Sequence, residues 1–268
     1  AILVFVIWIL FGGMEAVPHA LYSVISIFIV ACPCALGLVT PVALMRGIGK
    51  AARMHILIKD SLALERLSKA DIVVFDKTGT LTEGHPTVIA WLWAQCQEEY
   101  FKEVLLAAEM NSTNSLATAI STALREEGII PARLDVCEVL KGKGMRVVYK
   151  DAEYWVGSHK LLKDFSATVS DVMADMLVHY ESDGNGIIYF GRENELLAII
   201  AVSDPIKATS AEAVKELKRQ GIDICMLTGD GQRTALAVSS RLGIERFVAD
   251  ALPDDKAEFV RELQMQGK

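Results

Sequence analysis

The sequence predicts an α/β protein whose doubly wound parallel sheet carries an inserted α+β domain and follows a transmembrane helical hairpin. Apolar residues dominate the first 45 of the 268 positions, which is typical of membrane segments joined to a water-soluble body. Two short apolar runs farther along, each ending in a loop that contains Asp and Gly, indicate buried parallel strands. Strands that alternate with helices in this way favour a doubly wound core.

Two apolar stretches open the chain. Residues 1–11 are fewer than the about 20 that a spanning helix needs, so we expect a truncated membrane helix here. No basic region leads this run and no cleavage site follows it, so a secretory signal peptide is not favoured. The second stretch, about residues 20–46, is long enough to cross a membrane, and the basic residues that follow it predict a cytoplasmic location for the rest of the chain: Arg46, Lys50, Arg53 and Lys59. Residues 1–53 therefore predict a multi-pass protein of the inner or cell membrane.

The core of the soluble part is predicted from two matching units. Residues 72–75 form a β-branched run that ends at Asp76 and indicates a buried strand. The second unit comprises an amphipathic helix at 211–219, a strand at 222–227, a loop at 228–231 and a helix at about 234–242. We therefore assign residues 54–88 and 203–268 to one interrupted domain.

The segment between these halves, residues 89–202, has a different pattern. A helical pattern covers 100–124, and extended pieces follow at 145–149, 154–156 and 187–190. The simplest organisation is an α+β domain inserted into the α/β core.

Charge and cysteine content exclude some classes of function. The formal net charge is −7, so the chain has no basic excess to neutralise nucleic-acid phosphates, and nucleic acid is not an expected partner. The five cysteines are odd in number and scattered, unlike the disulfide framework of a small secreted domain.

The string DKTGTLT, residues 76–82, carries the strongest chemical signal. A carboxylate at the carboxyl end of a buried strand lies at the sheet edge where open α/β sheets bind ligands. Attack by Asp76 on a phosphoryl group requires neutralised charge and hydrogen-bond donors, which Lys77, nearby hydroxyls and glycine amides can help to supply. The pattern predicts a nucleophilic aspartate.

A second signal lies within the longer apolar stretch, at Cys32-Pro33-Cys34. Residues two apart on a regular helix point to different faces, so both thiols can bind one ion only where the helix is distorted. Pro33 supplies such a distortion because it lacks an amide hydrogen. Closely spaced thiolates suit Cu(I), and also Zn(II) or Cd(II).

DKTGTLT resembles the phosphorylation motif of P-type ATPases, which belong to the haloacid dehalogenase-like superfamily. The resemblance implies that ATP phosphorylates Asp76, with Mg²⁺ held by Asp76 and Thr78. It implies that Thr228, Gly229 and Asp230 form the second motif, whose Thr contacts the phosphoryl group, and that Lys256, within LPDDK, balances its charge. Residues 54–88 and 203–268 then correspond to the phosphorylation domain and residues 89–202 to the nucleotide-binding domain.

Cys32-Pro33-Cys34 upstream of this motif is similar to the arrangement in heavy-metal-transporting, CPx-type pumps, and CPCALGLVTP resembles the copper branch most. The resemblance implies export of a soft metal ion, Cu(I) or alternatively Zn(II) or Cd(II), bound by Cys32 and Cys34. It also implies a lipid membrane and a metallochaperone as partners.

Residues of the inserted domain resemble the ATP contacts of the same family. These are Glu109, Gly142, Gly144 and Gly157, together with Asn114, which with Ser115 occupies the place of the family's His-Pro dipeptide. Because Asn cannot stack as an imidazole does, we expect weakened nucleotide affinity.

The family's Mg²⁺-binding GDGxND loop and its actuator domain with the Thr-Gly-Glu loop do not occur in these 268 residues. We therefore expect this chain alone neither to turn over ATP steadily nor to move metal. A soluble phosphatase of the superfamily is a weaker alternative, since it usually has a second Asp where Thr78 lies. A metal-binding membrane module without catalysis is a further alternative.

Overall fold

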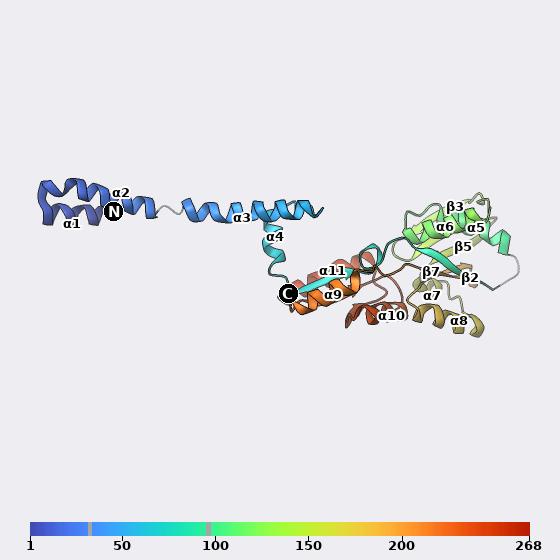
Figure 1. Ribbon diagram of the computed structural model, residues 1–268. Helices are drawn as coiled ribbons and strands as arrows, with labels where there is room; N and C mark the ends of the chain where they lie inside the picture. The colour runs from blue at the N-terminus through green and yellow to red at the C-terminus, as the bar shows by residue number, and fades with distance from the viewer. Residues whose placement is uncertain (32–33, 95–97) are drawn as a thin grey trace. The chain divides into compact units, whose positions relative to one another are not determined.

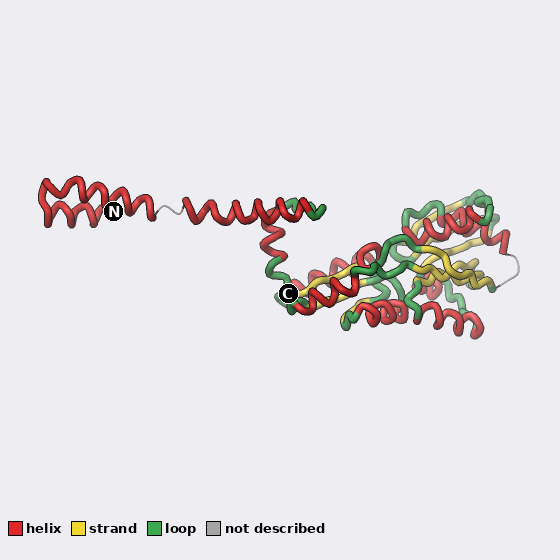
Figure 2. The backbone as a smooth tube through the Cα atoms, viewed as in Figure 1, coloured by secondary structure: helices red, strands yellow, loops and turns green. Residues whose placement is uncertain are grey.

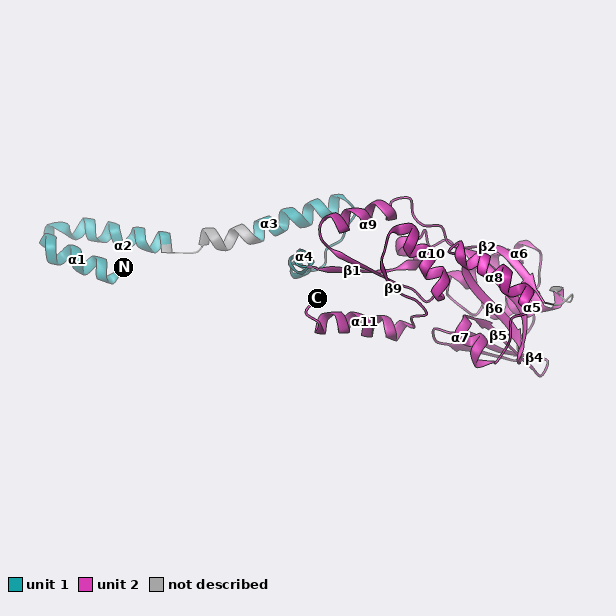
Figure 3. Cartoon of the chain, turned by 90° about the horizontal axis from the view of Figure 1, so that it is seen from below, with its two compact units in different colours: residues 1–69 teal, residues 70–268 magenta. Residues whose placement is uncertain are grey.

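The protein is described by a computed structural model that covers residues 1–31, 34–94 and 98–268, with two compact units at residues 1–69 and 70–268 (Figure 3). The side chains of residues 31–40 and 98 are not described.

The first unit is helical. Helices α1 (Ile2–Gly12) and α2 (Val17–Ala31) lie side by side in opposite directions, joined by the short turn η1 (Gly13–Ala16) (Figure 1). Helix α3 (Cys34–Arg53) and the short α4 (Ser61–Leu67) follow, and the Asp60 side chain caps α4 by accepting a hydrogen bond from the Leu62 amide. The predicted stretch at about 20–46 is thus divided between α2 and α3.

One apolar stretch of the described residues, 2–30, is long and apolar enough to cross a membrane. It includes the turn η1, and the helices on either side of this turn, α1 with 11 residues and α2 with 15, are each shorter than the about 20 that a full crossing requires.

The second unit contains the predicted parallel sheet. Strands β1 (Ile72–Asp76), β8 (Asp223–Leu227) and β9 (Arg246–Val248) are ordered β1-β8-β9, and both pairings are parallel. Helices α9 (Ser210–Arg219), α10 (Gln232–Leu242) and α11 (Pro253–Met265) accompany them. The α/β fold class is confirmed, and β1, α9, β8 and α10 begin and end within two residues of the predicted positions.

An antiparallel six-stranded sheet, ordered β2-β7-β6-β5-β4-β3, lies in the rest of this unit together with four helices of the described residues. Figure 2 shows strands in yellow and helices in red. Its strands are β2 (Thr87–Trp93), β3 (Val136–Leu140), β4 (Gly144–Tyr149), β5 (Ala152–Gly157), β6 (Gly186–Arg192) and β7 (Glu195–Ser203). Alternation along β5 sends Tyr154 toward α5 (Glu98–Glu109) and α6 (Ser115–Glu126), and Trp155 toward α7 (His159–Asp164) and α8 (Asp171–Ser182). A separate hydrophobic cluster therefore fills each face.

The chain enters and leaves this sheet at neighbouring points, because its first strand, β2, pairs with its last strand, β7. Just before the pair, the Thr82 hydroxyl donates to Asp204 at 2.6 Å and the Gly84 amide donates to the same carboxylate at 2.9 Å. The Lys207 ammonium donates to the Gly79 carbonyl at 2.9 Å. The returning chain thus braces the loop that follows Asp76.

Candidate functional site

Asp76 is the last residue of β1, and its partner on β8 is Leu227, so the next residue, Thr228, follows the neighbouring strand at the same sheet edge. The Asp76 side chain is 52% exposed and can meet a ligand, whereas Thr228 is buried. Two residues that are far apart in sequence are brought together because parallel strands end at one edge.

Two lysines neutralise the carboxylates of this edge. The Lys256 ammonium, from α11, donates to Asp76 Oδ1 at 2.8 Å. The buried Lys77 instead pairs with Asp230 Oδ2 at 2.5 Å, and the Thr228 hydroxyl donates to the same oxygen at 2.6 Å. In this structure Lys256, not Lys77, is the cation at the candidate nucleophile.

A cavity of about 490 Å³ opens beside Thr228 and Asp230, whereas Asp76, Lys77 and Lys256 do not belong to its lining. The parallel-sheet part contributes Thr78, residues 228–231, Thr234 and Asp250 to its lining. The antiparallel-sheet part contributes, among others, the five residues predicted to contact a nucleotide: Glu109, Asn114, Gly142, Gly144 and Gly157. The volume lies within the range of about 300–1,000 Å³ typical of ligand pockets.

Glu109 is the carboxylic acid of the lining whose pKa is clearly shifted. Its side chain is 6% exposed, and burial raises its pKa from 4.5 to about 7. At neutral pH this carboxyl group exists in both protonation states, so it can either donate or accept a hydrogen bond within the cavity.

Gly144 and Gly157 face each other across β4 and β5. A Cβ atom on Gly144 would collide with the Val156 carbonyl oxygen, and one on Gly157 would collide with the Lys143 carbonyl oxygen. Close strand packing therefore requires both glycines.

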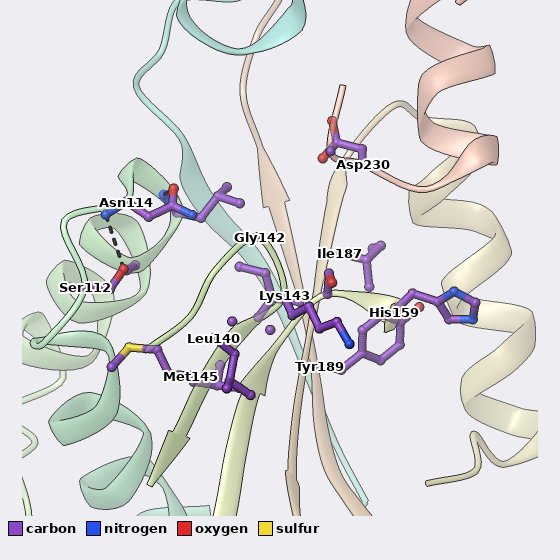
Figure 4. Close-up of a pocket in the computed structure, with 18 of the residues that line it drawn as sticks. Ser112, Asn114, Leu140, Gly142, Lys143, Met145, His159, Ile187, Tyr189 and Asp230 are labelled. Carbon is purple, nitrogen blue, oxygen red and sulfur yellow. Dashed lines mark hydrogen bonds between the residues drawn. The ribbon is translucent and has the colours of Figure 1, made fainter. Parts of the chain in front are cut away.

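Asn114 lies at the rim of the cavity with Ser112, whose hydroxyl accepts from the Asn114 amide (Figure 4). The Asn114 side chain caps α6, because its Oδ1 accepts from the Leu116 amide at 3.1 Å. Capping occupies this oxygen and leaves the side-chain NH₂ group as the donor that a ligand can use.

The oxygen donors of Asp76 and Thr78 suit a hard cation such as Mg²⁺, which binds through one or two carboxylates and keeps waters or substrate oxygens as its remaining ligands. Within the described residues no three His, Cys, Asp or Glu side chains gather as a metal site. Cys32 lies outside the described residues, and only the backbone of Cys34, at the start of α3, is described.

Some residues of this region were not predicted. The Arg233 guanidinium of α10 pairs with Glu181 of α8 at 3.2 Å, and Tyr189 and Asp250 line the cavity. Their positions depend on contacts between distant segments, for which the sequence carries no local signal.

Comparisons with known proteins agree with the α/β fold described above. Residues 70–268 match the family described as haloacid dehalogenase-like hydrolase. The whole chain is 37% identical to a copper-exporting P-type ATPase of Staphylococcus epidermidis and 38% identical to a silver-exporting P-type ATPase of Salmonella typhimurium, of which it covers 33% and 32%. The chain thus spans about a third of the length of these relatives.

Solved structures are also similar. A zinc-transporting PIB-type ATPase in the E2.Pi state matches 99% of this chain over 43% of its own, with 31% identity and a TM-score of 0.58. The catalytic domain of the CPx-ATPase CopB-B matches 82% of this chain over 77% of its own, with 22% identity and a TM-score of 0.67, and shows the shared fold.

Proposed function

Because the chain belongs to the haloacid dehalogenase-like hydrolases, we propose that it is the catalytic part of a P-type ATPase in which ATP phosphorylates Asp76 to drive export of a soft heavy-metal ion. We assign residues 54–88 and 203–268 to the phosphorylation domain and residues 89–202 to the nucleotide-binding domain. The protein is proposed to be a multi-pass membrane protein.

One observation carries this proposal: an accessible carboxylate, paired with a lysine at 2.8 Å, lies at the sheet edge beside a cavity large enough for a nucleotide. Thr78, two residues beyond Asp76, belongs to the cavity lining, as does Thr228. A nucleotide in the cavity can therefore direct its phosphate chain toward Asp76.

In the proposed step an Asp76 oxygen attacks the γ-phosphorus of ATP, and the bond from that phosphorus to the bridging oxygen breaks, releasing ADP. Lys256 pairs with the Asp76 carboxylate before attack and offsets the charge of the acyl phosphate afterwards. The Thr228 hydroxyl can turn from Asp230 to donate to a phosphoryl oxygen, while Lys77 holds Asp230 in place. Mg²⁺, held by Asp76 and Thr78 together with phosphate oxygens, would neutralise the charge of the phosphate groups.

Cu(I) is our proposed transported ion. Thiolates of Cys32 and Cys34 are soft ligands that suit Cu(I), and the copper- and silver-exporting relatives support this choice. The likeness to a zinc-transporting pump keeps Zn(II) and Cd(II) as the second candidates.

Metal-stimulated ATP hydrolysis by the full-length protein in membranes tests the ion. We expect Cu(I) or Ag(I) to stimulate hydrolysis and a Cys32→Ser, Cys34→Ser double variant to lose at least about 90% of the stimulation, because hydroxyls are poor ligands for soft ions. The Cys137→Ser variant is the control, since Cys137 lies in an exposed strand of the soluble unit. Stimulation by Zn(II) alone would reject copper, and full stimulation of the double variant would reject the Cys32–Cys34 site.

The pH dependence of stability tests the environment of Glu109. Its folded-state pKa of about 7 lies above its ordinary value of 4.5, so the folded state holds the proton more tightly. The stability that the protonated Glu109 contributes is therefore fully present below about pH 4.5 and is lost as pH rises through 7, by about 3 kcal/mol. Three of the four tryptophans lie in the six-stranded sheet (Trp91, Trp93 and Trp155), so tryptophan fluorescence can follow its unfolding. The denaturant midpoints should fall with pH more steeply in the wild type than in Glu109→Gln. Equal pH slopes would contradict the assigned shift.

A further inference from the structure

The hairpin loop between β3 and β4, residues 140–144 with the strand residue on each side included, contacts the start of α11, the helix that carries Lys256. From this contact we propose that Leu252 is a positioning residue: it seats the loop and so fixes the nucleotide cavity over Asp76 for phosphoryl transfer. The inference rests on the proposed function and extends it to a residue outside the cavity lining.

Gly142 shows how closely the two segments meet. A Cβ atom on Gly142 would lie 2.6 Å from Leu252 Cδ2 and 3.1 Å from Pro253 Cδ. The first turn of α11 therefore occupies the space that a side chain at position 142 would need. The φ angle of Gly142 is +71°, which also favours glycine. The missing side chain of Gly142 thus accommodates α11.

Leu252 is hydrogen-bonded through its backbone to Lys256, the residue that binds Asp76. The Leu252 residue precedes α11 as its N-cap, and its carbonyl accepts a hydrogen bond from the Lys256 amide at 3.1 Å. The Leu252 amide donates to Asp255 at 2.8 Å, which holds the first turn together. From the next turn, Lys256 reaches Asp76. The loop therefore rests on a rigid turn that is anchored at the reacting carboxylate.

The other side of the loop faces the cavity. Leu140, Gly142, Lys143 and Gly144 all belong to the lining, and Figure 4 shows three of them as sticks close to Met145. One short hairpin loop thus touches both the proposed nucleotide site and the helix of Lys256. A shift of this loop relative to Leu252 would change the distance from a bound nucleotide to Asp76.

A neighbouring ion pair adds little to this contact. The Lys141 ammonium lies 3.1 Å from Asp254 Oδ1, but the two side chains are 71% and 84% exposed. Solvent screens such a pair, so the apolar contact at Leu252 carries most of the seating.

A second contact between the parallel-sheet part and the antiparallel-sheet part lies elsewhere on the cavity. There the Thr234 hydroxyl donates to the Asn185 carbonyl at 2.8 Å and Arg233 pairs with Glu181. These residues belong to α10 and to the α8–β6 segment, neither of which carries Asp76 or Lys256. The Leu252 contact differs from this one because Leu252 precedes α11, whose Lys256 binds Asp76.

Comparison of a large and a small phosphoryl donor tests the proposal on the full-length protein. In Leu252→Ala we expect the rate of phosphoenzyme formation at saturating ATP to fall about tenfold, because a misplaced nucleotide reacts slowly. The affinity for ATP should stay within about twofold, since Leu252 does not line the cavity. Labelling of Asp76 by acetyl phosphate, in which the phosphoryl group passes to the carboxylate and acetate leaves, should be unchanged because this donor does not use the loop.

Matched variants exclude a general loss of structure. Val260→Ala removes a 38% exposed apolar side chain from the same helix and should leave all three measurements unchanged. Leu252→Met, which restores apolar volume, should recover most of the ATP-dependent rate. Equal losses with ATP and with acetyl phosphate would show that Leu252 only supports α11 and would overturn the proposal, as would an unchanged rate with ATP. Labelling from ATP that persists in Asp76→Asn would instead reject Asp76 as nucleophile and the proposed function with it.

Discussion

Replacement of Asp76 by Asn is expected to abolish the acid-stable, hydroxylamine-sensitive phosphoenzyme, with a decrease of at least about a thousandfold. The amide has nearly the size of the carboxylate and still offers Oδ1 to Lys256, so the fold should remain intact. A neutral amide lacks the charge that attacks phosphorus. Incorporation of radioactive phosphate from ATP into the full-length protein, followed by acid precipitation and hydroxylamine treatment, measures the effect.

The control for this change is Asp223→Asn, at the opposite end of the neighbouring strand. Asp223 pairs with Ile72 and lies at the amino end of β8, away from the site, so its variant should keep full labelling. ATP affinity of Asp76→Asn should stay equal or increase, because one negative charge near the phosphates is removed. Persistent labelling of Asp76→Asn would reject Asp76 as the phosphorylated residue.

Replacement of Gly157 by Val is expected to abolish ATP binding, with affinity reduced by at least about a hundredfold. The collision with the Lys143 carbonyl oxygen is a backbone contact, so no side-chain rotation can relieve it. Strands β4 and β5 must separate at the point where both line the cavity, and overpacking of this kind costs about 1–3 kcal/mol of stability. Calorimetric titration with a non-hydrolysable ATP analogue measures the loss, and circular dichroism checks that the sheet remains.

Gly49→Ala is the matched control for this steric argument. A Cβ atom on Gly49 meets nothing within 4 Å, and Gly49 lies inside helix α3, where Ala is favoured over Gly. This variant should bind the analogue normally. Normal binding by Gly157→Val would mean that the cavity at β4 and β5 is not the nucleotide site.

Local patterns predicted much of the core of the second unit. The β-branched run before Asp76 and the amphipathic pattern at 211–219 carry clear periodicity, so β1 and α9 were predicted close to their observed bounds. The adjacency of Asp76 and Thr228 followed from a general property of parallel sheets, whose loops at the carboxyl ends meet at one edge.

The remainder depends on long-range packing. Strand β7 is a continuous apolar run that periodicity alone cannot assign, and the exposed strand β3 lacks a clear alternation. The strand order β2-β7-β6-β5-β4-β3 is a property of pairings between distant segments. The contact of Gly142 with Leu252 could not be foreseen for the same reason, since a glycine in a turn has many possible causes.

The pairing of β2 with β7 also constrains movement. If two flexible linkers connected the six-stranded sheet to the rest of the unit, the sheet could turn freely. Instead, the two connections are β2 and β7, which are hydrogen-bonded to each other along their length. Such a strand pair bends more easily than its strands slide past each other. The hydrogen bond from Thr82 to Asp204 joins the two chain segments at the end of this strand pair, next to the loop that follows Asp76. Rocking of the six-stranded sheet is thereby limited mainly to one direction, and each such movement pulls on the segment that holds Asp76, the proposed nucleophile.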